Sequence, residues 1–281
     1  MLSDVTVIIV SYNQGSFIRQ AIESALHQTQ NPTQIILINN GSTDDTQKVI
    51  DHFVNLYYPV VVSFSYQHNH GQRTAFNKGL ELSHSRYTCF LDADDELDHR
   101  YLAQATHVLD TQKKVGVVYS DISLFGPREK IAWYMYPLSW RARQGSSYVI
   151  HVPSYSDDVK YELKKANYIH NSAVFRTQEA VTWGGFKDHK KYDLRHYLWY
   201  RFFDKEFEGH RIELPLYHYR QHSLYQASWQ WKMRGIEAQD EPDKHIIFLQ
   251  EEIERLKLSP FYKTEQILHR LAENFKCDCD K

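Results

Sequence analysis

Acidic residues gather directly after one short apolar stretch of this sequence, and their spacing suits a metal site. Tyr87–Leu91 is rich in strand-forming residues, and it runs into Asp92, Asp94 and Asp95. Side chains two residues apart in an extended chain leave the same face, so Asp92 and Asp94 can converge on one cation. Carboxylate oxygens suit Mg²⁺ or Mn²⁺, which keep coordination positions for water and for phosphate oxygens.

The same acids have a second interpretation, as the start of a helix. Asp98 is a good N-cap for the apolar repeat of Tyr101, Leu102, Ala105 and Leu109, and acidic residues favour helix N-termini. This stretch alone leaves both interpretations open.

Two βα units precede the acidic stretch. The β-branched run Val5–Val10 is typical of a strand buried on both faces of a parallel sheet, and apolar residues at helical spacing follow over Phe17–Leu26. Gln34–Ile38 is a second buried strand, and Ser42 with Asp45 matches a capping box for the next helix.

Further strands and helices continue this alternation. Val60–Tyr66 is a third strand, Thr74–Leu82 a third helix, and Val115–Tyr119 a strand beyond the acids. Strands that alternate with helices predict an α/β fold, with a mainly parallel sheet flanked by helices and a site at the carboxyl ends of the strands.

The periodicity weakens after this point. Residues 125–165 are rich in Trp and Tyr and contain Pro and Gly, so we expect an irregular, aromatic-rich segment that forms a lid on the acceptor side. Later elements are a strand over 173–176, a turn over 183–186, a helix over 192–207 and a strand over 210–214. The expected organisation is one domain over 1–228 and a C-terminal helical extension over 229–281.

Composition narrows the class of protein. The formal net charge is −2 with both signs interspersed, which argues against a nucleic-acid-binding surface. Cys89, Cys277 and Cys279 are too few for a disulfide framework. The start lacks a signal peptide's basic segment, and no apolar run approaches the ~18 residues of a membrane span. We expect a cytoplasmic protein; attachment to the inner face of the membrane and a homodimer stay open.

An ordered set of motifs carries a resemblance to a known family. The motifs are VIIVSYNQGSFIRQAIESALHQT, ILINNGSTDDT, NHGQRTAFNKGL, CFLDADDELD, SAVFR…WGGF and YHYRQHS, spread over residues 4–228. Together they resemble a family 2 glycosyltransferase with the Rossmann-like GT-A fold. The resemblance implies a nucleotide-diphospho-sugar donor, with UDP as the favoured nucleotide, and a carbohydrate, lipid-linked or other hydroxyl acceptor. It also favours metal binding by the acids over a helix cap.

The resemblance assigns roles to particular residues of this sequence. Asp94 is expected to bind Mg²⁺ or Mn²⁺ directly, with Asp92 at the ribose or at metal-bound water. Expected contacts to the nucleotide or its diphosphate come from Ser11, Tyr12, Asn13, Asn39, Arg73, Arg220 and His222. The family usually has Asp where this chain has Asn39, and an Asn carbonyl can still accept from uracil N3–H.

The catalytic base is the least complete part of the pattern. An inverting transferase needs a group that takes the proton of the acceptor hydroxyl. Relatives commonly carry Glu-Asp before a Leu-Trp-x-Arg helix, whereas this chain aligns Leu194 and Arg195 there. Asp193 is our first choice of base and Asp188 the second, and an acid elsewhere or no base at all stays open.

Two other functions compete. A catalytically silent nucleotide-sugar-binding protein on the same fold would explain Asn39 and the missing Glu-Asp pair. A glycoside hydrolase would need two acids facing each other across a sugar, and Asp92 and Asp94 are too close on one strand for that.

Overall fold

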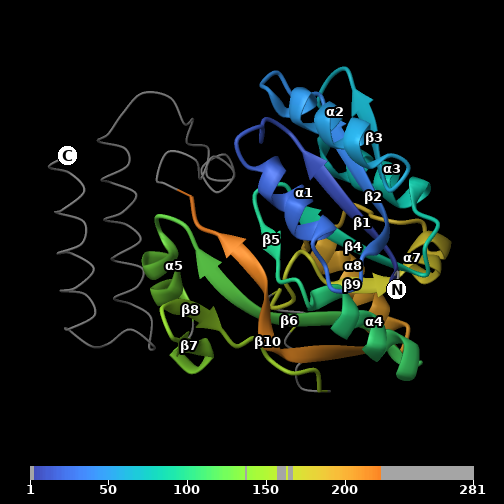
Figure 1. Cartoon of the computed structure of the whole chain (residues 1–281). Helices are drawn as coiled ribbons and strands as arrows, with labels where there is room; N and C mark the ends of the chain where they lie inside the picture. The colour runs from blue at the N-terminus through green and yellow to red at the C-terminus, as the bar shows by residue number, and fades with distance from the viewer. Residues whose placement is uncertain (1–2, 137, 157–162, 164–166, 223–281) are drawn as a thin grey trace, which may run out of the picture.

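The computed structural model describes residues 3–136, 138–156, 163 and 167–222, whose arrangement Figure 1 shows. The helical extension predicted over 229–281 lies outside these residues, as do Cys277 and Cys279. Among the helices of the described residues, none combines the length and the apolar character needed to span a bilayer.

One mixed sheet organises the described part of the chain. Its strands follow the order β3-β2-β1-β4-β9-β6-β10-β5, and β8 joins the sheet through β6 and pairs with β7. The bounds are β1 (Ser3–Ser11), β2 (Pro32–Asn40), β3 (Val61–Tyr66), β4 (Tyr87–Asp92), β5 (Glu96–Leu97), β6 (Val115–Phe125), β7 (Arg141–Gln144), β8 (Ser147–Ile150), β9 (Val174–Arg176) and β10 (Glu208–Arg220).

Strands β1 to β4 pair in parallel, so their carboxyl ends meet at one edge. In β1 every residue from Val5 to Ile9 is fully or almost fully buried, because its β-branched side chains pack on both faces of the sheet. The antiparallel strand β9 lies between β4 and β6, and its Val174 pairs with Cys89 on one side and Val118 on the other.

Helices flank this sheet (Figure 1). Their bounds are α1 (Ile18–Leu26), α2 (Thr46–Tyr57), α3 (Gly71–Leu82), α4 (Tyr101–Thr111), α5 (Glu129–Met135), α7 (Thr177–Thr182) and α8 (Leu194–Asp204), with a 3₁₀ turn η1 (Leu138–Trp140). Helix α3 packs on β1 and β2, α4 on β1, β6, β9 and β10, and α8 on β6 and β10.

An aromatic cluster fixes α3 and the turn over 183–186 against β4. The ring centroid of Phe90 lies 5.1 Å from that of Phe76 and 5.0 Å from that of Phe186. Each such pair contributes about 0.5–1.5 kcal/mol beyond the area it buries. The turn is also held by Asn77, whose amide accepts from Phe186 N at 2.7 Å and donates to Phe186 O at 3.0 Å.

The α/β fold with a mainly parallel sheet is confirmed, and three local predictions are corrected. The described part of 125–165 is not irregular: it holds α5, η1 and the β7–β8 hairpin. Strands of four residues about Gly145, whose φ is +59°, are too short for a readable alternation. The predicted strand over 210–214 is part of the longer β10.

The predicted capping box is wrong. The hydroxyl of Ser42 accepts from Asn13 N instead, at 3.0 Å, and Asp44 accepts from Thr46 N at 3.0 Å. The polar residues before α2 therefore bind the first loop as well as the helix start.

Candidate functional site

The acids follow β4 as the sequence predicts. Asp92 is the last residue of β4, and Asp94 lies in the turn that leads to β5. Asp95 is buried; it accepts from the Tyr217 hydroxyl and, at 2.9 Å, from Arg220 N. Burial, with the charges of Asp94 and Asp92, raises the pKa of Asp95 well above its usual range. Asp95 therefore anchors the turn to β10, and Asp92 and Asp94 are the acids left for a ligand.

Asp92 is held by a cation that the sequence analysis did not assign to the site. The guanidinium of Arg195, at the start of α8, binds both carboxylate oxygens of Asp92, and Asn171 donates to Asp92 Oδ2 at 2.8 Å. Arg195 is almost buried and lies over the ring of Phe76, 4.5 Å from its centroid. The position where the family resemblance leads us to expect an acid thus carries a positive charge, which is fixed against Asp92.

Arg220 and His222 reach the acids from the end of β10. His222 Nε2 lies 2.7 Å from Asp94 Oδ2, and Arg220 Nε donates to the Asp94 carbonyl oxygen at 2.7 Å. Arg220 also binds Glu96 at 2.9 Å. The late Tyr-Arg-x-His stretch and the acids are therefore adjacent, and the expected contact of Arg220 and His222 with the diphosphate stays a prediction.

The carboxylate oxygens at the site can bind one divalent cation, with one carboxylate as the protein ligand. Both oxygens of Asp92 are paired with Arg195, whereas Asp94 Oδ1 has no hydrogen bond among the described residues. No group of three His, Cys, Asp or Glu side chains converges within the described part of the chain. Mg²⁺ is commonly bound by one or two carboxylates together with substrate phosphates, so Asp94 is the residue suited to hold it.

The loop after β1, which is predicted to contact the nucleotide, is hydrogen-bonded to the loop after β2. Asn13 has φ +55°, a left-handed conformation that Asn tolerates, and its Oδ1 accepts from Thr43 N at 2.8 Å. Tyr12 is exposed beside it. Ser11 is buried, and its hydroxyl has no partner within the described residues. The loop presents one aromatic ring and one unpaired hydroxyl at the carboxyl end of β1.

Asn39 is buried at the end of β2, and both ends of its amide are occupied. Its Oδ1 accepts from Ser42 N at 2.9 Å, and its Nδ2 donates to Gln47 Oε1 at 2.7 Å. The Ser65 hydroxyl donates to the same Gln47 oxygen, at 2.7 Å. The Gln47 amide turns its oxygen toward position 39, and that oxygen needs a donor there. The amide of Asn39 supplies one, whereas a carboxylate at this position could not.

Arg73, which is predicted to contact the nucleotide, forms an ion pair with Asp188, the second choice of base. Arg73 Nη1 lies 2.6 Å from Asp188 Oδ2. Both side chains are more than half exposed, so the pair contributes at most about 1 kcal/mol to stability. The exposed pair can open to a ligand at small cost.

Asp193, the first-choice base, is the N-cap of α8. Its Oδ1 accepts from Arg195 N at 3.1 Å and from His196 N at 2.9 Å. This cap fixes the first turn of α8, the turn that carries Arg195 to Asp92. Asp193 as a base stays a prediction, and its structural role is a separate one.

Replacing the cap separates the two roles. Asp193→Ala is expected to lower the free energy of unfolding by about 1 kcal/mol, because two backbone N–H groups lose their acceptor. Asp193→Asn should leave stability nearly unchanged, since Asn caps helices as well as Asp does. Thermal unfolding of both variants checks this; equal destabilisation by Ala and Asn would contradict the cap.

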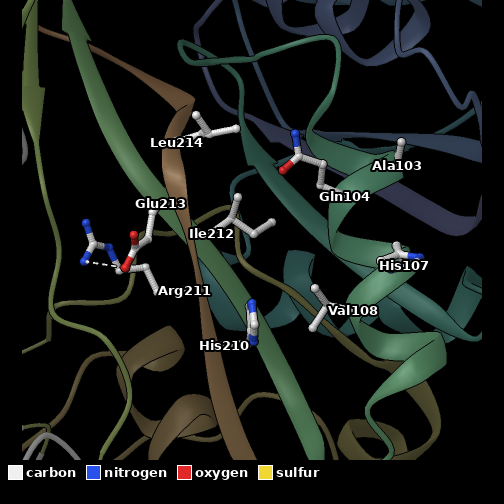
Figure 2. A pocket seen from close by; sticks show the side chains of 9 residues that line it. All are labelled: Ala103, Gln104, His107, Val108, His210, Arg211, Ile212, Glu213 and Leu214. Carbon is white, nitrogen blue, oxygen red and sulfur yellow. Dashed lines mark ion pairs between the residues drawn. The ribbon is translucent and has the colours of Figure 1, made fainter.

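A cavity of the described residues lies elsewhere. It has a volume of about 670 Å³ and is open between α4 and β10. Figure 2 shows Gln104, Val108 and Ile212 facing into it, while Arg211 points to the other side of β10. No acid of the candidate site lines this cavity, so we place the site at the strand ends on the chemistry of the residues and not on the volume.

The sequence reasoning missed Arg195, Asn171 and Gln47 as members of the site. In the sequence Arg195 stands where an acid is expected, and a cation at that place is itself a signal. Asn171 and Gln47 carry no local pattern, because their partners are distant in sequence or set by the loop conformation.

Comparisons with known proteins identify the family of this chain. Residues 6–178 match the family model described as glycosyl transferase family 2. An uncharacterized glycosyltransferase of Nostoc is 34% identical over 115 residues, which cover 41% of this chain and 35% of that protein. This chain therefore spans well under half of the length of that relative.

Solved structures share the fold. TarS of S. aureus in complex with UDP-GlcNAc has a TM-score of 0.58 at 14% identity, covering 92% of this chain and 68% of that one. A mannosyltransferase from Pyrobaculum calidifontis in complex with GDP-Man and Mn²⁺ has a TM-score of 0.59 at 14% identity, covering 84% and 61%. These likenesses confirm the GT-A fold. With more than half of its residues matched by the family model, the chain belongs to glycosyltransferase family 2.

Proposed function

We propose that this chain is a metal-dependent, inverting glycosyltransferase. It moves a sugar from a nucleotide-diphospho-sugar, with UDP as the favoured nucleotide, to a hydroxyl group of a glycan, a lipid-linked sugar or another acceptor. The observation that carries the proposal is Asp94: its Oδ1 has no hydrogen bond among the described residues, and Arg220 and His222 lie against it. The molecules bound in the two structural neighbours, UDP-GlcNAc and GDP-Man, are both nucleotide-diphospho-sugars, which supports a donor of that class.

In the proposed reaction the acceptor oxygen attacks the anomeric carbon from the side opposite the diphosphate. The carbon–oxygen bond to the diphosphate breaks, and the configuration inverts. Negative charge grows on the leaving diphosphate, and the Arg220 guanidinium at the Asp94 turn stabilises it. Mg²⁺ or Mn²⁺, when bound, supplies Lewis-acid stabilisation of the same charge, and Asp94 would hold it.

Asp92 has a different part in this proposal. Arg195 and Asn171 fix the orientation of its carboxylate, and one lone pair of Oδ1 stays available. In this proposal Asp92 accepts a hydrogen bond from the donor ribose. The nucleobase is assigned to Asn39, whose Oδ1 accepts one hydrogen bond, from Ser42 N, and keeps a second lone pair. The base that takes the acceptor proton is predicted as Asp193 or, second, Asp188.

Nucleotide binding tests the proposal directly. We expect titration calorimetry of the full chain to detect UDP binding in the presence of Mn²⁺, and removal of the metal with EDTA to weaken it at least about tenfold, or ~1.4 kcal/mol. GDP and ADP serve as competing nucleotides. If none of the three diphosphates binds with Mn²⁺ present, the proposed function is wrong.

Turnover separates transfer from silent binding. The alternative of a catalytically silent binder is favoured by one observation, the cation at Arg195 where relatives have acids. A panel of UDP- and GDP-sugars with and without hydroxyl acceptors should release nucleoside diphosphate if the chain is a transferase. Metal-dependent binding without release from any donor would favour the silent protein.

A further inference from the structure

A second buried carboxylate lies on β6, apart from the acids that follow β4. Asp121 is fully buried. It accepts from Arg211 Nε at 2.7 Å, from Arg211 Nη2 at 2.9 Å and from Val152 N at 3.1 Å, and its Oδ2 lies 2.6 Å from His151 Nδ1. With a guanidinium against both of its oxygens, Asp121 acts as an acceptor only.

This arrangement decides the tautomer of His151. Because Asp121 accepts, Nδ1 of His151 carries the proton, and Nε2 of the neutral ring keeps its lone pair. Among the described residues Nε2 has no hydrogen-bond partner, and 47% of the side-chain surface is exposed. A buried carboxylate that orients an imidazole through Nδ1, with Nε2 free, is the arrangement that takes protons from hydroxyl groups in hydrolases.

Asp121 on β6 and Asp92 on β4 lie at the same height along their strands. Val174 of β9 pairs with Cys89 and with Val118, and Asp92 and Asp121 each lie three residues further along their own strand. Since β9 separates β4 from β6 at Val174, the Cα atoms of Cys89 and Val118 are roughly 10 Å apart, and Asp92 and Asp121 lie beyond them in the same direction.

Side-chain contacts link the two places. Asn171 donates to Asp92, and the preceding residue, His170, accepts from Ser120 N at 2.9 Å. Alternation along β6 turns Asp121 to the face opposite Ser120, toward Arg211. Figure 2 shows Arg211 on the side of β10 that faces away from α4. Helix α8, whose Arg195 holds Asp92, packs against β6 and β10.

We propose that His151, oriented by Asp121, is the general base of the transfer reaction. This inference rests on the proposed function and deepens it, because it gives a base to a chain that has Leu194 and Arg195 where relatives have acids. The two acids predicted from the sequence have other partners: Asp193 caps α8, and Asp188 binds Arg73.

The step balances as a single displacement. The acceptor hydroxyl gives its proton to His151 Nε2 while its oxygen forms the bond to the anomeric carbon. The electron pair of the broken bond leaves with the diphosphate. The imidazolium is stabilised by its hydrogen bond to the Asp121 carboxylate, and the ring then releases its proton to water. His151 is the catalytic residue, and Asp121 is a positioning residue.

Substitution of His151 in the full chain is the test. We expect His151→Gln and His151→Gly to lower kcat for transfer by about 10²–10⁴-fold, the usual contribution of a general base. The affinity for UDP with Mn²⁺ should change less than about twofold, since the ring is placed at the acceptor and not at the nucleotide. Added imidazole should restore part of the activity of His151→Gly, which a merely structural histidine would not allow.

Asp121→Asn tests the positioning role. The amide can donate to Nδ1 and so favour the tautomer with the proton on Nε2, and we expect kcat to fall while KM for the donor stays within about twofold. Asp121 is buried, so Asp121→Asn risks misfolding. The test of the general base therefore rests on His151→Gln, because the His151 ring is exposed and its replacement should not disturb the fold.

The outcomes are distinct. Transfer by His151→Gln within twofold of the unchanged chain overturns the inference, as does loss of transfer with Asp193→Asn or Asp188→Asn while His151→Gln stays active. Failure of the unchanged chain to bind any nucleoside diphosphate overturns the proposed function instead.

Discussion

Asp94→Asn is expected to lower kcat/KM for sugar transfer by about 10²–10³-fold, the loss typical of removing one group that stabilises a developing charge. The reason is local: Asp94 Oδ1 has no hydrogen bond among the described residues, whereas the charge of Asp92 is already paired with the Arg195 guanidinium, which donates to both of its oxygens. An amide keeps the size of the side chain but brings no charge to the metal. Initial rates with a UDP-sugar donor at varied Mn²⁺ measure the effect.

Asp98→Asn is the matched control for this substitution. Asp98 stands in the same acidic stretch, but its carboxylate accepts from Arg100 N at 2.9 Å and from the Arg100 guanidinium at 2.8 Å. We expect transfer by Asp98→Asn within about threefold of the unchanged chain, less than 1 kcal/mol. Retention of Mn²⁺-dependent transfer in Asp94→Asn would remove Asp94 from the metal site.

Arg195→Met should affect both stability and donor binding. Removing one partner of a fully buried ion pair costs about 3–5 kcal/mol, and because Asp92 is 26% exposed we expect about 2 kcal/mol here. The uncompensated charge of Asp92 would also repel the donor diphosphate, so UDP affinity should fall about tenfold, or ~1.4 kcal/mol. Denaturant unfolding and calorimetry with UDP measure the two effects.

Two further variants give this prediction its contrast. Arg195→Lys keeps the positive charge but loses the two parallel hydrogen bonds, so it should fall between Met and the unchanged chain. Arg73→Ala removes an exposed ion pair and should change stability by at most about 1 kcal/mol. Equal stability of Arg195→Met and the unchanged chain would show that the pair with Asp92 is not a stabilising one.

The parts that the sequence predicts well are those with local signals. The run Val5–Val10 and the apolar stretch before Asp92 form buried strands because their side chains are apolar on both faces and are stabilised by removal from water. The motif that holds Arg220 and His222 is also local, whereas the contact of both residues with Asp94 is a finding of the structure.

What the sequence could not supply is pairing across long separations. The ion pair between Arg195 and Asp92 depends on how α8 is placed against β4, and no periodicity reports that placement. The same holds for His151 and Asp121, which come from a four-residue strand's end and from a long buried strand. The β7–β8 hairpin was missed because short strands give too few residues for a pattern.

The contact between α8 and β4 also has an evolutionary consequence. A chain with acids at 194 and 195 would set like charges against Asp92, whereas this chain has a cation there. Positions 92 and 195 are therefore not free to change one at a time: exchanging Arg195 for an acid would leave two carboxylates together unless a cation or a second substitution arrived first.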